Sequence, residues 1–245
     1  MYDKITMLAA GAVLLRGAPG FAQVHATDVI LTVQNGRIVT GRVDNGVTVS
    51  PRYVFQGILG ETGIPGVTFN PGCDSEDGTF VPNTPVGLTI RRSLRIWNGQ
   101  NGFDLLPGSP PVTTMNLVKN TTTISTPASD PPNCGIGDSL ALGLANSVGR
   151  LHQHPAYQLI GQSDTGIYLL ELQVWMNDSS TGVSDPIAIL LNQNETLANA
   201  DAAFAWAEAH FHSACYANCD GSTTAPVLNV LDFSCFLNRF AAGCT

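Results

Sequence analysis

The chain has 245 residues, enough for one large domain or for a medium domain with a small one. Hydrophobic residues make up 44% and charged residues only 12%, with 25 Gly and 15 Pro, which is typical of a turn-rich all-β protein with a packed core. The net charge of −8 without a basic stripe excludes nucleic acid as a partner, because such binding needs Lys and Arg to displace phosphate counterions.

Residues 1–26 have the pattern of a signal peptide. Lys4 precedes an apolar stretch at 5–15, and small residues then allow cleavage after Ala22 or Ala26. The apolar stretch is too short to cross a bilayer, which takes about 20 residues. We therefore expect a secreted, extracellular or cell-surface protein without a transmembrane segment in the mature chain.

Strand patterns begin at residue 29. Two Asn-Gly pairs, Asn35-Gly36 and Asn45-Gly46, separate alternating apolar runs at 29–33, 37–43 and 47–49, and each pair predicts a hairpin. Further apolar runs predict strands at 53–59, 86–97, 113–118, 122–125, 139–148, 157–160, 167–175 and 187–191.

The strand at 167–175 has two different faces. One face carries the apolar set Tyr168, Leu170, Leu172 and Val174, which we assign to the core. Trp175 lies on the other face, where partial exposure would suit a ligand-binding role toward a glycan, whereas core packing is the commoner fate of Trp.

Helical periodicity is found only from residue 196. Residues 196–212 are rich in Ala and place Phe204, Ala207 and Phe211 on one face, with Asn199 or Asp201 as the predicted N-cap. Many short strands followed by one helix predict a mainly β fold for residues 27–212, an antiparallel β-sandwich or jelly roll with a C-terminal helix.

The six cysteines predict disulfides rather than a metal site, because export permits oxidation and only one close pair is present. They are Cys73, Cys134, Cys215, Cys219, Cys235 and Cys244. Six cysteines allow many pairings, so connectivity stays an inference. We favour a bond between Cys73 and Cys134 and two bonds within residues 213–245.

The tail carries a recognisable pattern. The segment 227–233 reads Val-Leu-Asn-Val-Leu-Asp-Phe, an apolar helical stripe follows, and the chain ends with Gly243-Cys244 before a last Thr. Residues 213–245 thus resemble one repeat of the GC-type dockerin domains that end many secreted bacterial proteins. The resemblance implies a Ca²⁺ loop followed by a helix, with Asp220, Asn229 and Asp232 as the Ca²⁺ ligands.

The loop departs from the dockerin pattern. It is one residue longer than usual, its middle positions 222–225 lack carboxylates, and Pro226 replaces the expected Gly. Bonds joining Cys219 to Cys235 and Cys215 to Cys244 would then replace Ca²⁺ in holding the module together, or supplement it. The leading hypothesis is a structural or binding protein that this module anchors or docks to a cell-surface or extracellular protein or polysaccharide.

A second hypothesis is metal binding. His152 and His154 stand two residues apart, and on a strand such residues share a face, so both imidazoles reach one ion of Zn²⁺ or Cu²⁺ type. The third ligand would be Glu171, His210, His212 or His25. The competing interpretation is a solvated start of a strand.

A third hypothesis is a secreted hydrolase. Gly137-Asp138-Ser139-Leu140 resembles the opening block of GDSL esterases, in which the Ser is the nucleophile. The required strand–turn–helix context is missing, and Leu151 stands where that family has the Asp that precedes its His. We interpret this match as coincidental and do not predict an enzyme.

Overall fold

The structure is a computed structural model that describes residues 27–106, 112–131, 137–161 and 165–211, together with Val230, Phe233, Ser234 and Leu237. The predicted signal peptide, Cys134 and all four tail cysteines lie outside the described residues. The division of the chain at residues 26 and 212 therefore stays a prediction.

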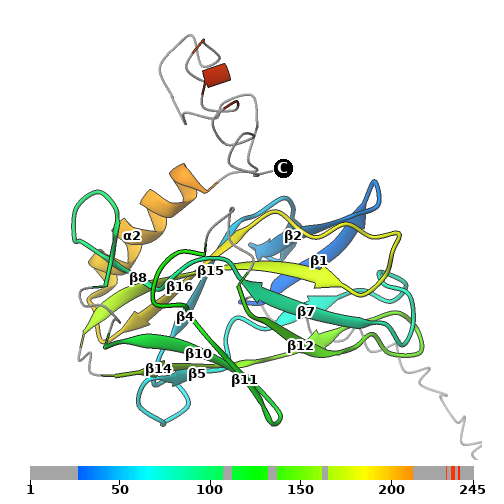
Figure 1. Cartoon of the computed structure of the whole chain (residues 1–245), viewed down its shortest axis with the longest axis horizontal. Helices are drawn as coiled ribbons and strands as arrows, with labels where there is room; N and C mark the ends of the chain where they lie inside the picture. The colour runs from blue at the N-terminus through cyan, green and yellow to red at the C-terminus, as the bar shows by residue number, and fades with distance from the viewer. Residues whose placement is uncertain are drawn as a thin grey trace, which may run out of the picture.

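The described residues form three sheets and one helix (Figure 1). The first sheet has the order β13-β6-β1-β2-β3 and consists of β1 (Val29–Gln34), β2 (Arg37–Asp44), β3 (Val47–Val49), β6 (Cys73–Ser75) and β13 (His152–Gln153). The second has the order β11-β10-β14-β5 and consists of β5 (Val67–Thr68), β10 (Thr114–Lys119), β11 (Thr122–Ser125) and β14 (Ala156–Ile160).

The third sheet is the largest and has seven strands. Its order is β12-β7-β15-β16-β4, with β8 pairing with β15 and β9 with β8. It consists of β4 (Val54–Ile58), β7 (Pro85–Ile90), β8 (Arg95–Trp97), β9 (Phe103–Leu105), β12 (Ser139–Leu144), β15 (Gly166–Met176) and β16 (Ile187–Gln193). The helix α2 (Leu197–His210) follows β16.

Both predicted Asn-Gly hairpins are confirmed. Asn35 and Gly36 have φ angles of 51° and 74°, and Asn45 and Gly46 have 53° and 79°. Two successive positive φ angles make a tight turn whose twist matches that of the flanking strands, and Asn and Gly tolerate them best. The turns join β1 to β2 and β2 to β3 in antiparallel register.

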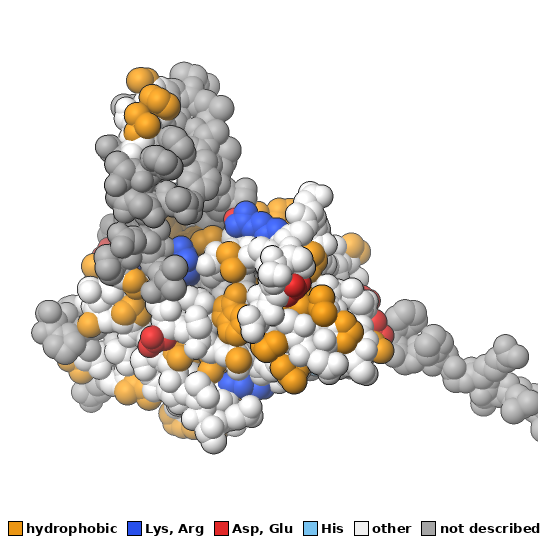
Figure 2. All heavy atoms as spheres, turned by 45° about the vertical axis from the view of Figure 1, so that its right-hand side comes forward, with side chains coloured by type: hydrophobic (Ala, Val, Ile, Leu, Met, Phe, Trp, Pro, Cys, Tyr) orange, Lys and Arg blue, Asp and Glu red, His pale blue; other side chains and the backbone are white. Residues whose placement is uncertain are grey.

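One hydrophobic core joins all three sheets. Its buried residues include Leu31 from the first sheet, Leu117 from the second and Leu170 from the third. The predicted core face of β15 is confirmed, since the alternate residues from Tyr168 to Val174 all belong to this cluster. The surface in Figure 2 carries few charged side chains and scattered apolar ones, as the low charge content predicts.

A mainly β fold is therefore confirmed, but the sheets are not wholly antiparallel. β1 pairs in parallel with β6, and β4 pairs in parallel with β16. Parallel neighbours need long crossover connections, which turn signals along the chain do not reveal. The finer prediction of a sandwich or jelly roll with a disulfide-linked terminal module stays a prediction.

The helix α2 packs on the outer side of the third sheet, where it contacts β4 and β16 (Figure 1). Ala203 and Ala207 are buried against a second cluster that includes Leu190. The predicted N-cap was wrong: Thr196 is the cap, and its hydroxyl accepts a hydrogen bond from the Asn199 amide at 3.2 Å. Among the described residues, no helix has the length and apolar character needed to cross a membrane.

Candidate metal centre

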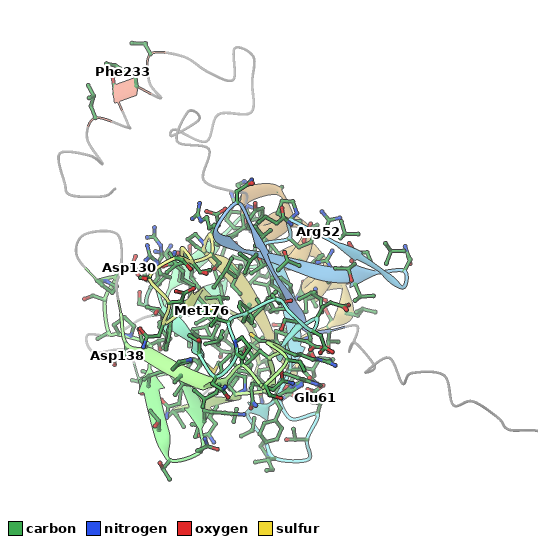
Figure 3. The ribbon with its side chains drawn as sticks, turned by 90° about the vertical axis from the view of Figure 1, so that its right-hand side faces the viewer. Arg52, Glu61, Asp130, Asp138, Met176 and Phe233 are labelled. Carbon is green, nitrogen blue, oxygen red and sulfur yellow. The ribbon has the colours of Figure 1, made fainter. Side chains whose placement is uncertain are left out.

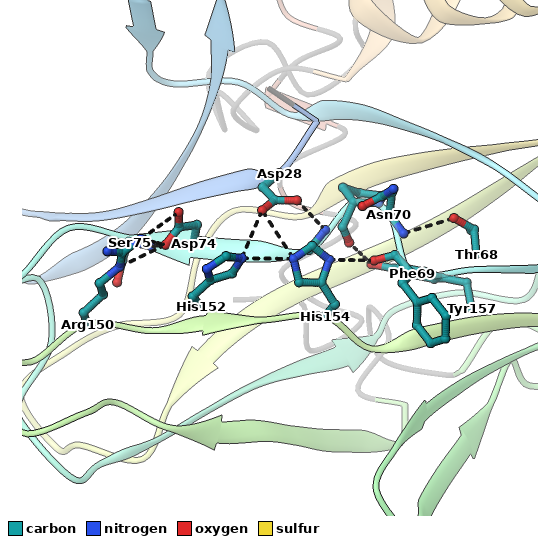
Figure 4. A network of polar contacts seen from close by, with 12 residues as sticks. Asp28, Thr68, Phe69, Asn70, Asp74, Ser75, Arg150, His152, His154 and Tyr157 are labelled. Atoms are coloured by element: carbon teal, nitrogen blue, oxygen red, sulfur yellow. Dashed lines mark hydrogen bonds and ion pairs between the residues drawn. The ribbon is translucent and has the colours of Figure 1, made fainter. Parts of the chain in front are cut away.

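Asp28, His152 and His154 meet on one face of the first sheet (Figure 4). The strand β13 pairs with one side of β6, which places His152 opposite Asp74 and brings His154 beside Gly72. The strand β1 pairs with the other side of β6. Asp28 immediately precedes β1, and its carboxylate accepts a hydrogen bond from the Gly72 amide. The three side chains therefore converge across β6 from both sides.

Their donor atoms form a compact triangle. The Nε2 atoms of His152 and His154 are 3.1 Å apart, and Asp28 Oδ2 lies 3.7 and 3.6 Å from them. A point equidistant from three atoms with these spacings lies about 2 Å from each, which matches Zn–N and Zn–O distances of about 2.0–2.2 Å. The triangle thus has the right size for a transition-metal ion.

The carboxylate of Asp28 is the buried part of the group, with 0% exposure. Its Oδ1 accepts a hydrogen bond from the Gly72 amide at 2.9 Å, whereas Oδ2 has no hydrogen-bond partner among the residues that the structure describes. A buried carboxylate oxygen without a partner is costly, because it has lost its hydration and gained nothing in exchange. An ion between Oδ2 and the two imidazoles would remove this cost.

The ring of His154 is oriented by a second contact. Its Nδ1 lies 2.9 Å from the carbonyl oxygen of Phe69, which can only accept, so Nδ1 is the donor (Figure 4). In the neutral ring this leaves the lone pair of Nε2 directed toward His152 and Asp28. A histidine that binds a metal through one nitrogen commonly donates its other N–H in this way.

Gly72 makes room for the site. A Cβ built at this position would lie 2.4 Å from Cε1, 2.5 Å from Nδ1 and 2.7 Å from Nε2 of His154. Any other residue at position 72 would push this imidazole away. Gly72 and Asp28 could not be recognised from the sequence alone, because their role depends on pairings between strands that are distant in the chain.

The neighbouring Asp74 is not available as a further ligand. Arg150 Nη2 lies 3.0 and 3.2 Å from its two carboxylate oxygens, and the Ser75 amide also donates to Oδ1. This arginine balances the charge of Asp74, which is 1% exposed. Among the described residues, the two histidines are the ion-pair partners of Asp28, so the negative charge of Asp28 has no permanent cation beside it.

Cys73 lies on the core side of β6. Burial, with the charges of Asp28 and Asp74, raises the pKa of its thiol to about 12, and its sulfur does not belong to the group of possible ligand atoms formed by Asp28, His152 and His154. The predicted bond from Cys73 to Cys134 stays a prediction. Cys73 has a free, buried thiol, and Cys134 lies outside the described residues.

The third ligands expected from the sequence lie elsewhere or outside the described residues. Glu171 forms an ion pair with Arg92 at 3.1 Å. Burial raises the pKa of the Glu171 carboxyl, although the charges of the nearby arginines act in the opposite direction. His210 stacks on Trp206 with ring centroids 4.0 Å apart. The remaining two, His25 and His212, are not described, and Asp28 supplies the third group instead.

Of the other predicted site residues, the structure describes Trp175 and Ser139. Trp175 is half-buried on β15, on the face opposite the core as predicted. Ser139 begins β12, and its hydroxyl lies 2.7 Å from that of Thr89. The predicted Ca²⁺ ligands Asp220, Asn229 and Asp232 lie outside the described residues and stay predictions, as do the four tail cysteines.

Comparisons with models of known protein families and with curated protein sequences found no match to this chain. The function must therefore be argued from the geometry of the site.

Proposed function

We propose that the protein is an exported binding module that holds one divalent transition-metal ion at Asp28, His152 and His154. The observation that carries the proposal is the buried, unpartnered Oδ2 of Asp28 facing two imidazole nitrogens at 3.6–3.7 Å. Two imidazoles and one carboxylate suit Zn²⁺ or Cu²⁺, whereas Ca²⁺ and Mg²⁺ prefer oxygen ligands throughout.

The site is open on its outer side. The side chains of His152 and His154 are 36% and 25% exposed, so solvent reaches their edge of the triangle. Three protein ligands leave at least one position of a four-coordinate ion for water or an external ligand. This arrangement favours an ion that exchanges with the surroundings over one sealed inside the fold.

We expect purified wild-type protein to bind one equivalent of Zn²⁺ in a calorimetric titration after treatment with a chelator. The double variant His152→Ala/His154→Ala and the variant Asp28→Asn should each lose at least about 100-fold in affinity, because every ligand supplies a large share of the coordination energy. A matched control is His210→Ala, since His210 lies on α2 with its ring on Trp206. Unchanged zinc affinity in the double variant would refute the proposal.

We propose a second role for residues 213–245, which is to dock the module to a cell-surface or extracellular protein or polysaccharide. The dockerin-like sequence pattern supports this role, with Ca²⁺ at Asp220, Asn229 and Asp232. A second support is that Val230, Phe233 and Leu237 are helical, exposed and spaced for one helix face; Phe233 is labelled in Figure 3. An exposed apolar helix face is typical of a binding surface.

Deletion of residues 213–245 should release the protein from the surface of the producing cells into the medium, because the docking face is lost. Immunoblots of the cell and medium fractions would measure this distribution. The triple variant Val230→Ser/Phe233→Ser/Leu237→Ser should act in the same direction if the helix face is responsible. Retention of the truncated protein on cells would contradict the docking role while leaving the metal site unaffected.

A further inference from the structure

The outer face of the third sheet is covered by α2 over β16 and β4 but carries polar and aromatic side chains over β12, β7 and β15. Strand register arranges these side chains in two adjacent rows. One row is Ala141, Gly87 and Trp175, and the other is Ser139, Thr89 and Gln173. We call these six residues the Trp175 face. The two rows are separated by one pleat repeat of about 6.7 Å.

Trp175 lies over the strand β7 at Gly87. A Cβ at Gly87 would lie 2.2 Å from Cζ2 and 2.5 Å from Cε2 of the indole, so only glycine lets the six-membered ring rest against the backbone there. The side chain is half-buried, and its neighbour Ala141 on the other side of Gly87 is exposed. The indole therefore forms a low aromatic platform next to a small side chain.

The second row holds polar groups in fixed orientations. Gln173 Oε1 accepts a hydrogen bond from Arg91 at 2.9 Å, and its Nε2 donates to the Ser184 carbonyl at 2.7 Å. The hydroxyls of Ser139 and Thr89 are 2.7 Å apart. A hydroxyl offers one donor and two acceptor positions, so Ser139, which is exposed, retains bonding capacity for a ligand after this hydrogen bond, whereas Thr89 is 8% exposed and holds the Ser139 hydroxyl in place.

Four charged groups at the end of the rows form ion pairs with one another. They are Arg92, Arg95, Asp130 and Glu171. Arg92 lies 3.1 Å from Glu171, and Asp130 lies 3.3 Å from Arg92 and 2.7 Å from Arg95. Burial opposes ionisation of Asp130, but hydrogen bonds from Ser93 and the charge of Arg95 outweigh it and lower its pKa. Arg91, which is bonded to Gln173, adds a third positive charge to these two arginines and two carboxylates, so most but not all of the charge beside the face is compensated within the protein, which favours an uncharged ligand.

We propose that the Trp175 face binds a neutral polysaccharide chain. One sugar ring would lie with its C–H face on the indole, and the hydroxyls of the chain would bond to Ser139 and Gln173, with Thr89 orienting Ser139 from below. A pyranose ring combines an apolar face with hydroxyls around its rim, and the platform beside a polar row matches both. This site lies on a different sheet from the metal centre and does not depend on it.

The proposal is tested by affinity electrophoresis of the full chain in gels containing cellulose derivative, xylan, mannan or starch, with polygalacturonate as the acidic comparison. At least one neutral polymer should retard the wild type. Trp175→Ala should weaken that binding at least about tenfold, because it removes a buried aromatic contact. Trp175→Phe should lose less, since an aromatic ring remains.

Two controls separate this site from folding and from the metal centre. The near-ultraviolet circular dichroism of Trp175→Phe should show an intact tertiary structure, and the His152→Ala/His154→Ala variant should bind the polymer as the wild type does. Binding to none of the four neutral polymers, binding to polygalacturonate alone, or equal retardation of Trp175→Ala would overturn the proposal. None of these results would bear on zinc binding.

Discussion

The Gly72→Ala variant is expected to lose its zinc affinity although all three ligands are retained. The added Cβ would lie 2.4 Å from Cε1 of His154, so the imidazole has to move. Its Nδ1 is bonded to the Phe69 carbonyl at 2.9 Å, and any rotation that clears the Cβ also disturbs this bond and displaces Nε2. We expect a loss of about 10–100-fold in zinc affinity and about 1–3 kcal/mol in stability.

Gly102→Ala is the matched control, because the nearest atom to its Cβ would be Asn98 Nδ2 at 3.7 Å, an ordinary contact. This control should bind zinc with wild-type affinity. Calorimetric titration of both variants, with chemical denaturation of the metal-free forms, separates the loss of the ion from the loss of stability. Wild-type zinc affinity in Gly72→Ala would show that the ion is not held in the observed arrangement of the rings.

The Arg150→Ala variant is expected to be destabilised by about 3–5 kcal/mol, because it leaves the carboxylate of Asp74 buried without its cation. Asp74 is 1% exposed and receives both nitrogens of the Arg150 fork, at 3.0–3.3 Å. The desolvation of Asp74 has already taken place in the fold, and no other described cation pairs with it. Urea denaturation monitored by fluorescence would measure the change in the free energy of unfolding.

Arg37→Ala provides the comparison for an exposed pair. The side chain of Arg37 is 51% exposed and lies 2.7 Å from Asp185, so its removal should cost less than about 1 kcal/mol. The shortest distances in the two ion pairs are similar, 2.7 and 3.0 Å, whereas the pairs differ in burial and in the number of hydrogen bonds to the carboxylate. Equal shifts in the urea midpoint for the two variants would contradict the importance that we assign to burial at Asp74.

Local chemistry in the sequence predicted much of the fold. Asn35-Gly36 and Asn45-Gly46 indicated hairpins because positive φ angles at two successive residues favour these amino acids. The alternation along β15 indicated its core face because side chains on a strand point to opposite sides. Both signals act within a few residues and do not depend on the rest of the chain.

The residues of the metal centre were only partly predictable, because sequence signals of this kind act within a few residues. His152 and His154 are two residues apart, so the strand period alone placed them on one face. Asp28 joins them only because β1 and β13 flank β6, and one of those pairings is parallel. Nothing near Asp28 or Gly72 in the sequence indicates that pairing. The predicted N-cap of α2 was wrong by only a few residues. Thr196 caps the helix, three residues before Asn199.

The parallel pairing of β4 with β16 has a consequence for biogenesis. The strand β4 has β16 as its sheet neighbour, and β16 is made last among the strands that the structure describes. During synthesis Val54 and Phe55 therefore leave the ribosome long before the segment that shields them. Contacts between such distant segments slow folding and prolong the exposure of apolar surface. The third sheet is therefore complete only after β16 has been synthesised. A chaperone that binds unfolded chains would protect the domain until then.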